Sequence, residues 1–350
     1  MSETQSSLFE GFNSLEELGE LGLIEKIAGM FGRHRTSSTA GIGDDCAVLP
    51  FGNSESMLVT TDLLIENTHF YLDRISPRDL GYKALAVNLS DISAMGGKPV
   101  YAFLSIGLPL DIPLDWLDAF LSETRKLSEQ YHVKLMGGDT TKSESGLLIN
   151  YTVLGIAKHD QILWRSNAKP GDKIALLGST GESGAGLKLL EINDLPDDEK
   201  YRQLIKVHNR PRIFIREAQF LARSPAVHAM IDLSDGILSD AGHIAEESGA
   251  TLQIDVEELP LSKNLRETCE KFEWQPLELA LSAGEDYSLL FTIDKTEIEK
   301  VRNEFREKFS VPFSVIGDVT DGPSELRLNS DGNSFKINKR GYDPFKNIES

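Results

Sequence analysis

One apolar segment limits what this chain can fold into, because it reads as a buried helix. The segment from Tyr82 to Gly97 has no Gly or Pro until Gly96, and apolar side chains occupy almost every side of the helix. It nevertheless carries Asn88 and Asp91, three residues apart and therefore on one face. A buried carboxylate is costly unless it is paired, hydrogen-bonded or bound to a metal. Asp91 is therefore either held by a hydrogen bond from a neighbouring loop or part of a functional site.

The composition is that of an ordinary globular protein with a large acidic excess. The chain has 350 residues, 40% apolar and 26% charged, which is enough for two domains. Its net charge of −19 argues against a nucleic-acid partner, which needs a basic face. The longest apolar-rich run, Leu147 to Ala157, is too short and too polar for a membrane span, and the acidic N-terminus is not a secretory signal. Cys46 and Cys269 suggest neither a disulfide framework nor a zinc site, so we expect a cytoplasmic protein.

The order of the expected elements predicts an α/β fold, in the α+β sense, with two domains that are each a mixed sheet covered by helices. We expect a polar N-terminal extension (1–17), an N-terminal domain (18–164) and a C-terminal α/β domain (165–350). The junction is the Pro- and Gly-containing stretch Arg165 to Asp172. The main expected helices are 18–31, 77–97, 114–131, 187–192, 212–222, 237–248, 262–272, 277–281 and 295–309. The main expected strands are 57–64, 100–108, 133–136, 147–157, 173–177, 229–232, 251–256, 288–292, 313–317 and 326–328.

An acidic residue beside Gly, Ser or Thr recurs where apolar elements begin or end. A single case is weak evidence, because Asp is common in turns and at helix N-caps, but six cases need another explanation. The six segments are 41–46 (GIGDDC), 60–62 (TTD), 88–91 (NLSD), 137–141 (GGDTT), 232–236 (DLSDG) and 282–286 (SAGED). If the first four converge, mutual repulsion raises the pKa values of their carboxylates unless cations fill the space. Hydroxyl and carboxylate oxygens suit Mg²⁺ better than zinc, and Mg²⁺ in turn binds polyphosphate.

This residue pattern favours phosphoryl transfer over other chemistries. No Ser-His-Asp or Cys-His arrangement stands out, and phosphoryl transfer needs cations and positioning more than protein acids and bases. If the acceptor is itself a phosphate, its second pKa of about 6 leaves it nucleophilic without a general base. The glycine-rich segment 178–186 matches no standard phosphate loop, so it either binds an anion at a helix N-terminus or is a tight turn. Asp44 and Asp45 point to opposite faces of an extended chain, and we favour Asp45 as the ligand without excluding Asp44.

The whole set of motifs resembles the thiamine-monophosphate kinase family, within the superfamily of aminoimidazole ribonucleotide synthetase. The resemblance covers about residues 18–346 and rests on motifs in matching order: GIGDDCAVL, TTDLLIENTHF, YKALAVNLSDISAMGG, MGGDTT, RSNAKPGD, IDLSDGILSD, SAGEDYSLLF and GYDPF. It implies ATP-dependent phosphorylation of thiamine monophosphate to thiamine diphosphate by direct in-line transfer. It also implies a homodimer whose N-terminal sheets join into a barrel, with nucleotide and metals in a cleft between the domains.

Carried over motif by motif, the resemblance assigns roles to residues of this chain. The implied Mg²⁺ ligands are Asp45, Thr60, Thr61, Asp62, Asp91, Asp139 and Asp232, with Asp235 a further candidate; the catalytic carboxylates are Asp45, Asp62, Asp91, Asp139 and Asp232. The implied ATP contacts are Gly138, Asp139, Arg165 and Ser234, and the implied thiamine monophosphate contacts are His69, Glu285 and Tyr342. Arg165 can fork onto phosphate oxygens. Glu285 either attracts the cationic thiazolium or accepts a hydrogen bond from the aminopyrimidine, and Tyr342 can stack on a ring.

Two other functions remain in competition at this point. Another ATP-dependent synthetase of the same superfamily would activate an amide or a selenide, and selenide chemistry calls for a reactive cysteine in a mobile N-terminal loop. Cys46 instead stands at a strand start, and Cys269 in a helix. A non-catalytic binder of nucleotide or thiamine phosphate would have no need for so many carboxylates.

Overall fold

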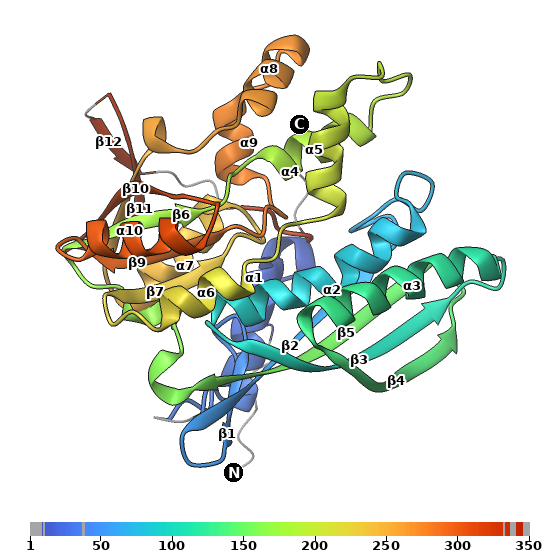
Figure 1. The fold of residues 1–350 in the computed structure, drawn as a ribbon, viewed down its shortest axis with the longest axis horizontal. Helices are drawn as coiled ribbons and strands as arrows, with labels where there is room; N and C mark the ends of the chain where they lie inside the picture. The colour runs from blue at the N-terminus through green and yellow to red at the C-terminus, as the bar shows by residue number, and fades with distance from the viewer. Residues whose placement is uncertain (1–8, 10, 37–38, 332, 337–340, 346–350) are drawn as a thin grey trace.

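Two mixed β-sheets with helices organise the chain, as expected from the sequence (Figure 1). The computed structural model describes residues 9, 11–36, 39–331, 333–336 and 341–345. Residues 1–8 and 10 of the expected N-terminal extension lie outside the described residues. The strand orders are β1-β2-β5-β3-β4 in the first sheet and β12-β11-β8-β10-β6-β9-β7 in the second.

The N-terminal half supplies the first sheet and the helices that cover it. Its elements are α1 (Leu15–Phe31), β1 (Ala47–Phe51), β2 (Glu55–Ile65), α2 (Pro77–Ala94), β3 (Lys98–Leu108), α3 (Leu114–Tyr131), β4 (Lys134–Lys142) and β5 (Leu148–Lys158). Only the β3–β4 pair is parallel among these neighbours. One face of the sheet is covered by α2 and α3 (Figure 1). The other face exposes apolar side chains, among them Leu63 on β2 and Tyr101 and Phe103 on β3.

The C-terminal half builds the second sheet with helices on both faces. Its elements are β6 (Asp172–Leu177), α4 (Glu182–Leu190), α5 (Glu199–Asn209), α6 (Ile215–Ala222), β7 (Val227–Asp232), α7 (Ile237–Ser248), β8 (Thr251–Asp255), α8 (Lys263–Phe272), α9 (Pro276–Ser282), β9 (Leu289–Asp294), α10 (Ile298–Lys308), β10 (Phe313–Thr320), β11 (Glu325–Ser330) and β12 (Asn333–Lys336). Alternate residues of β6 pack into different cores: Ile174 lies with residues of α7, and Ala175 with residues of α6 and α10. This alternation is the period of two that a strand buried on both faces requires.

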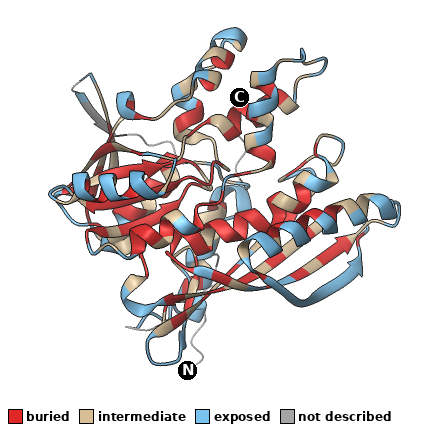
Figure 2. Cartoon of the chain, viewed as in Figure 1, coloured by how far each residue is buried: buried red, intermediate tan, exposed pale blue. Residues whose placement is uncertain are grey.

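Helix α2 joins the two halves, and the segment singled out in the sequence is buried along its length (Figure 2). Ser76 caps its N-terminus by accepting from the Asp79 amide, and Pro77 occupies the first turn, where a missing N–H costs nothing. Leu85 packs in the core of the first half, whereas Ala94 packs in a core of the second half. The helix contacts β2 and β5 on one side and β7, α5 and α6 on the other. It is therefore buried on all sides because both halves pack against it.

Three expectations about local structure are wrong, for identifiable reasons. The strand expected at 133–136 continues to Lys142, because the chain through Gly138 stays paired with β3; a Cβ at Gly138 would lie 1.6 Å from the Leu104 carbonyl oxygen, so the position requires glycine. The glycine-rich segment is helical from Glu182, and its Gly186 allows α5 to approach closely, since a Cβ there would lie 2.3 Å from the Leu204 carbonyl oxygen. Helix α5 and strand β12 were not expected at all.

None of the helices in the described part of the chain combines the length and the hydropathy that a membrane span requires.

Candidate active site

Three carboxylates from distant parts of the chain converge at the carboxyl end of β7, the edge strand of the second sheet. Asp45 comes from the turn before β1, Asp91 from α2 and Asp232 from the last position of β7. One oxygen from each lies within 4.8 Å of the others. The geometry distinguishes the adjacent pair at the start of β1, because Asp45 belongs to this triad and Asp44 does not. We call Asp45, Asp91 and Asp232 the carboxylate triad.

Hydroxyl groups and a fourth carboxylate surround the triad. The Thr60 hydroxyl donates to Asp91 Oδ2, and the Ser90 hydroxyl donates to Asp232 Oδ2 at 2.5 Å. The Asp62 carboxyl also forms a hydrogen bond with Asp91. Thr60 and Asp62 lie two residues apart on β2 and so share the face that α2 covers. The expected TTD segment therefore delivers its first and third residues to the site.

Crowding of these carboxylates perturbs their protonation. Burial raises the pKa of Asp91 well above its ordinary value, and the charges of Asp62, Asp232 and Asp45 add to the effect. Burial and then the Asp45 charge likewise raise the pKa of Asp232. Burial raises the pKa of Asp62 to about 6, against the lowering effect of its hydrogen bond with Asp91. The negative charges therefore repel one another in the ligand-free protein.

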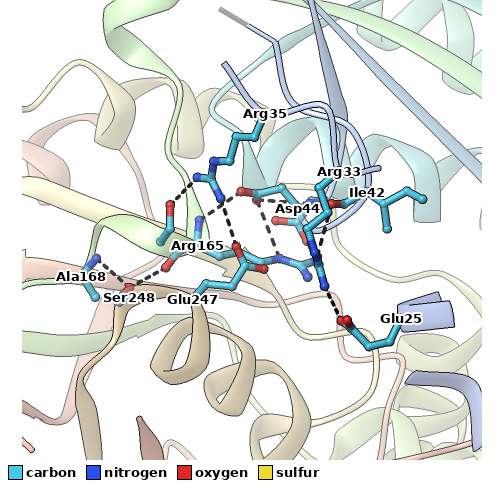
Figure 3. A network of polar contacts seen from close by, with 11 residues as sticks. Glu25, Arg33, Arg35, Ile42, Asp44, Arg165, Ala168, Glu247 and Ser248 are labelled. Carbon is cyan, nitrogen blue, oxygen red and sulfur yellow. Dashed lines mark hydrogen bonds and ion pairs between the residues drawn. The ribbon is translucent and has the colours of Figure 1, made fainter. Parts of the chain in front are cut away.

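Arg165 is the cation that faces this group of carboxylates. Its Nη2 lies 2.5 Å from Asp45 Oδ1, and its Nε lies 3.7 Å from Asp44 Oδ1. Burial lowers the pKa of the guanidinium, but Asp45 and Asp44 outweigh burial and raise it overall. Figure 3 shows Glu247 and Arg35 in the same polar network as Arg165 and Asp44, with Arg35 Nη1 3.6 Å from Glu247 Oε2. The Arg165 backbone is fixed as well, because the Ser248 hydroxyl donates to its carbonyl oxygen at 2.8 Å.

The donor set fits Mg²⁺. Asp45 Oδ2 is buried and has no hydrogen-bond partner among the described residues, which is costly for a charged oxygen. The surrounding donors are all carboxylate or hydroxyl oxygens, the ligands that a hard divalent cation prefers. One arginine does not balance four neighbouring carboxylates. The observed chemistry therefore favours occupation by hard cations.

A pocket between the two halves adjoins the triad and contains two of the expected substrate contacts. It is lined by Thr68, His69, Phe70, Tyr71, Arg74, Ile75, Leu187, Leu190, His208, Asn209 and Glu285. His69 Nδ1 accepts from the Ile65 amide at 3.0 Å, so its other ring nitrogen remains for the pocket. Tyr287 lies near both groups of charges: burial raises the pKa of its hydroxyl, and the charges of Glu285, Asp62, Asp232 and Asp91 raise it further.

The C-terminal motif also lies beside this pocket. The Tyr342 amide donates to the Asp235 carbonyl oxygen at 3.2 Å, and the charge of Glu285 contributes, after burial, to raising the pKa of the Tyr342 hydroxyl. The Glu285 amide donates to the Ser234 carbonyl oxygen at 2.8 Å, which ties the SAGED and DLSDG segments together. Burial raises the pKa of Asp235 to about 7, with Glu20 the next largest cause. The expected ATP contact Ser234 thus lies between the triad residue Asp232 and the pocket.

Two expected site residues, Thr61 and Asp139, lie on the other side of the first sheet. Thr61 alternates with Thr60 and Asp62, and its hydroxyl lies 3.1 Å from that of Thr152. Asp139 and Gly138 lie on the exposed edge strand β4, opposite Ser105 and Leu104 of β3, and the Thr140 amide donates to Asp139 Oδ1 at 3.0 Å. The structure does not bring these residues to the triad. Their assigned roles stay predictions.

Some residues of the site were not expected from the sequence. Two of them could have been found in the sequence. Ser90 stands next to Asp91, and Lys83 is a basic residue in an otherwise apolar helix. His208 lies on α5, the charged helix that sequence patterns did not predict. Asp286, the last residue of the SAGED segment, has a structural position, because it accepts from the Gly181 and Ser183 amides at the start of α4.

Comparisons with known proteins agree with this architecture. The family described as AIR synthase related protein matches through its N-terminal domain at residues 43–157 and its C-terminal domain at residues 169–328. A thiamine-monophosphate kinase of Buchnera aphidicola (subsp. Acyrthosiphon pisum) is 40% identical over 308 residues, covering 87% of this chain and 92% of the relative. That of Escherichia coli K12 is 38% identical over 328 residues, covering 93% and 98%.

Solved structures give the same result. The structure described as AaThiL complexed with AMPPCP and TMP has a TM-score of 0.83 and 34% identity, covering 95% of this chain and 99% of that chain. The thiamine monophosphate kinase from Aquifex aeolicus has a TM-score of 0.78 and 32% identity, covering 93% and 99%. With the fold, the length and the motif order all in agreement, the chain belongs to the thiamine-monophosphate kinase family of AIR synthase related proteins.

Proposed function

We propose that this kinase transfers the terminal phosphoryl group of ATP directly to the phosphate of thiamine monophosphate, forming thiamine diphosphate, with several Mg²⁺ ions assisting. The observation that carries the proposal is the position of the carboxylate triad and Arg165 beside a pocket that contains His69 and Glu285. The triad and Arg165 suit a phosphate group with its cations, and the neighbouring pocket suits an organic ring system. Together they fit an acceptor with one phosphate and two heterocyclic rings. A relative's structure with AMPPCP and TMP supports the same pair of ligands.

The roles of the residues follow from their chemistry. Asp45, Asp62, Asp91 and Asp232 would hold the cations, with Thr60 orienting Asp91. Bound Mg²⁺ would supply the positive charge that the phosphates and the carboxylates share. Arg165 can bind phosphate oxygens as a planar fork, once those oxygens compete with Asp45 for its guanidinium. No general base is required, because the acceptor phosphate is mostly a dianion at neutral pH. Ser234 and Asp235 stay candidates for contacts to ATP and to a further cation, and a cytoplasmic location stays a prediction.

We also propose that the protein is a homodimer, formed through the exposed face of the first sheet. The support is an uncovered strand face with apolar side chains, including Leu63, Tyr101 and Phe103, which are 39–47% exposed. Thr61 and Asp139 share this face, so any cation or nucleotide contact that they make lies at the interface between protomers. Phe103→Asp should convert the dimer to a monomer in light scattering, because it places a charge within an apolar interface. Leu110→Asp, an exposed position in the loop after β3, is the matched control and should leave the mass unchanged.

A direct assay tests the reaction. Purified protein is incubated with ATP, Mg²⁺ and thiamine monophosphate, and the nucleotides and thiamine phosphates are resolved by chromatography. We expect stoichiometric thiamine diphosphate and ADP, and loss of both products in Asp45→Asn. Absence of both products from the wild-type protein across a range of Mg²⁺ concentrations would refute the proposal. The selenide alternative has little support, because Cys46 is buried and burial, with Asp91 and Asp45, raises the pKa of its thiol well above its ordinary value.

A further inference from the structure

A buried lysine lies behind the carboxylate that the substrate pocket presents. Lys83, on α2, has a fully buried side chain, and its Nζ lies 2.9 Å from Glu285 Oε1. The Glu285 side chain is 24% exposed and lines the pocket. A fully buried lysine is rare unless it is paired, and Glu285 is the carboxylate that pairs with Lys83.

His208 lies beside the second oxygen of the same carboxylate and beside Lys83. Its Nδ1 lies 3.5 Å from Glu285 Oε2 and 3.0 Å from the Ser183 hydroxyl, and its Nε2 lies 3.4 Å from Lys83 Nζ. Burial, with Lys83 next, lowers the pKa of His208 to about 4, so the ring is neutral at physiological pH. A neutral ring that accepts from the Lys83 ammonium at Nε2 carries its proton at Nδ1, where it donates toward Ser183 and Glu285.

The Glu285 backbone is constrained as well. Glu285 has a φ of +64°, in the left-handed region that non-glycine residues rarely adopt, and Tyr287 has a φ of +49°. Such conformations carry backbone strain, and they persist only where the surrounding structure imposes them. The carboxylate is therefore fixed by its backbone and by Lys83, and His208 in turn holds Lys83.

The balance of charge decides what this carboxylate can recognise. Burial raises the pKa of Glu285, but the charge of Lys83 is the largest of the opposing effects, so that pKa lies below its ordinary value and the group is ionised. Burial lowers the pKa of His69, the histidine on the other side of the pocket. Lys83 cancels the charge of Glu285, and Arg74 adds a positive charge to the pocket lining. The ion pair with Lys83 therefore leaves Glu285 little net charge of its own to attract a cation such as the thiazolium, and what Glu285 offers is a directed acceptor with free lone pairs.

We propose that Lys83 and His208 are positioning residues that hold Glu285 as a fixed, charge-balanced hydrogen-bond acceptor, and that this acceptor selects the amino group of the substrate's pyrimidine. The inference rests on the proposed function for the identity of the substrate. It distinguishes between the two roles that the sequence left open for Glu285. The carboxylate accepts a hydrogen bond from the amino group and does not attract the ring cation. An analogue with a carbonyl oxygen in place of the amino group places acceptor against acceptor and is rejected.

The test measures binding and turnover separately. Calorimetry gives the affinities of the wild-type protein for thiamine monophosphate and for its 4-oxo analogue, and steady-state kinetics give KM and kcat with each. We expect the amino compound to bind roughly 100-fold more tightly, the effect of leaving a charged acceptor unsatisfied. In Lys83→Met the preference should fall below about tenfold, with KM for thiamine monophosphate raised and KM for ATP changed by less than about twofold.

Two further variants keep the test decisive. Lys83→Met combined with Glu285→Gln removes both charges, so thermal stability should return toward that of the wild type while the amino preference stays lost. Lys126→Met removes the lysine of another Lys–Glu pair, at 3.7 Å from Glu123 on exposed α3, and should change neither quantity. An undiminished amino preference in Lys83→Met, or in the double variant if the single one does not fold, overturns the inference. So does an equal rise in KM for both substrates. If the wild-type protein binds the amino compound selectively but forms no thiamine diphosphate, the proposed function fails and this inference stands.

Discussion

Replacing Asp91 with asparagine should stabilise the ligand-free protein while it abolishes turnover. The native structure holds Asp91 with a pKa well above 3.8, whereas the unfolded chain ionises near 3.8. Between those values the unfolded state binds fewer protons than the native state, so native stability falls as the pH rises. Asparagine is neutral in both states and escapes this penalty. Its amide oxygen can still accept from Thr60, and its amide nitrogen can donate to Asp62.

The expected gain depends on pH in a way that the structure sets. A pH of 7 lies about 3 units above the unfolded-state pKa of 3.8. At 1.36 kcal/mol per unit, this limits the increase in the free energy of unfolding to about 4 kcal/mol. At pH 5 the limit is about 1.6 kcal/mol, and near pH 4 the gain vanishes. Urea unfolding followed by tryptophan fluorescence, without divalent cations, measures these differences. The control is Asp139→Asn on the exposed strand β4, which should change stability by less than about 0.5 kcal/mol at either pH.

Two results would refute this reasoning. If Asp91→Asn is no more stable than the wild type at pH 7, the triad is not under electrostatic repulsion in the ligand-free protein. If a gain is present but independent of pH, its cause is packing and not charge. Mg²⁺ should stabilise the wild type more than the variant, because the variant has lost one anionic ligand.

Three other substitutions have expected outcomes. Arg165→Gln leaves buried Asp45 without its cation, so the ligand-free protein should lose about 3–5 kcal/mol in urea unfolding, and calorimetry should show weaker ATP binding; unchanged ATP affinity would count against its phosphate role. Gly138→Ala should lower the melting temperature strongly, since its Cβ would overlap the Leu104 carbonyl, and a wild-type melting temperature would contradict the strand path. Ser90→Ala should cost about 1–3 kcal/mol by leaving Asp232 without its donor, and Mg²⁺ affinity measured by calorimetry should change with it.

The sequence predicted most of the fold because its patterns were local. The boundaries of α3 and α7 follow from apolar periodicity, and α2 from an uninterrupted apolar segment between Pro77 and Gly96. Helix α5 escaped prediction because its sequence is charged and its buried apolar side chains, Tyr201 and Leu204, pack against α4 and α8. The glycine pair in β4 looked like a turn, since only the contact with Leu104 reveals why a strand needs glycine there.

The sequence predicted those residues of the candidate site that belong to a recurring motif. Asp45, Asp62, Asp91 and Asp232 each stand beside Gly, Ser or Thr, or one residue from it, and the repetition of this pattern along the chain was enough to indicate convergence. The sequence could not show that Thr61 and Asp139 lie on the opposite face of the first sheet, because that depends on strand register. Nor could it pair Lys83 with Glu285, which are about two hundred positions apart and meet only when α2 packs beside the SAGED segment.

The hydrogen bond from Ser90 to Asp232 has a consequence for the molecule as a whole. It connects helix α2 to the edge strand of the second sheet, at the same place where Asp45, Asp91 and Asp232 gather. The triad therefore exists only while the two halves are docked, so binding of the proposed cations and docking of the halves are linked equilibria. Ligands that bind only the docked state stabilise it by RT ln(1 + [L]/Kd). Removing divalent cations with a chelator should then loosen the attachment between the halves, and native-state hydrogen exchange should quicken along both α2 and β7.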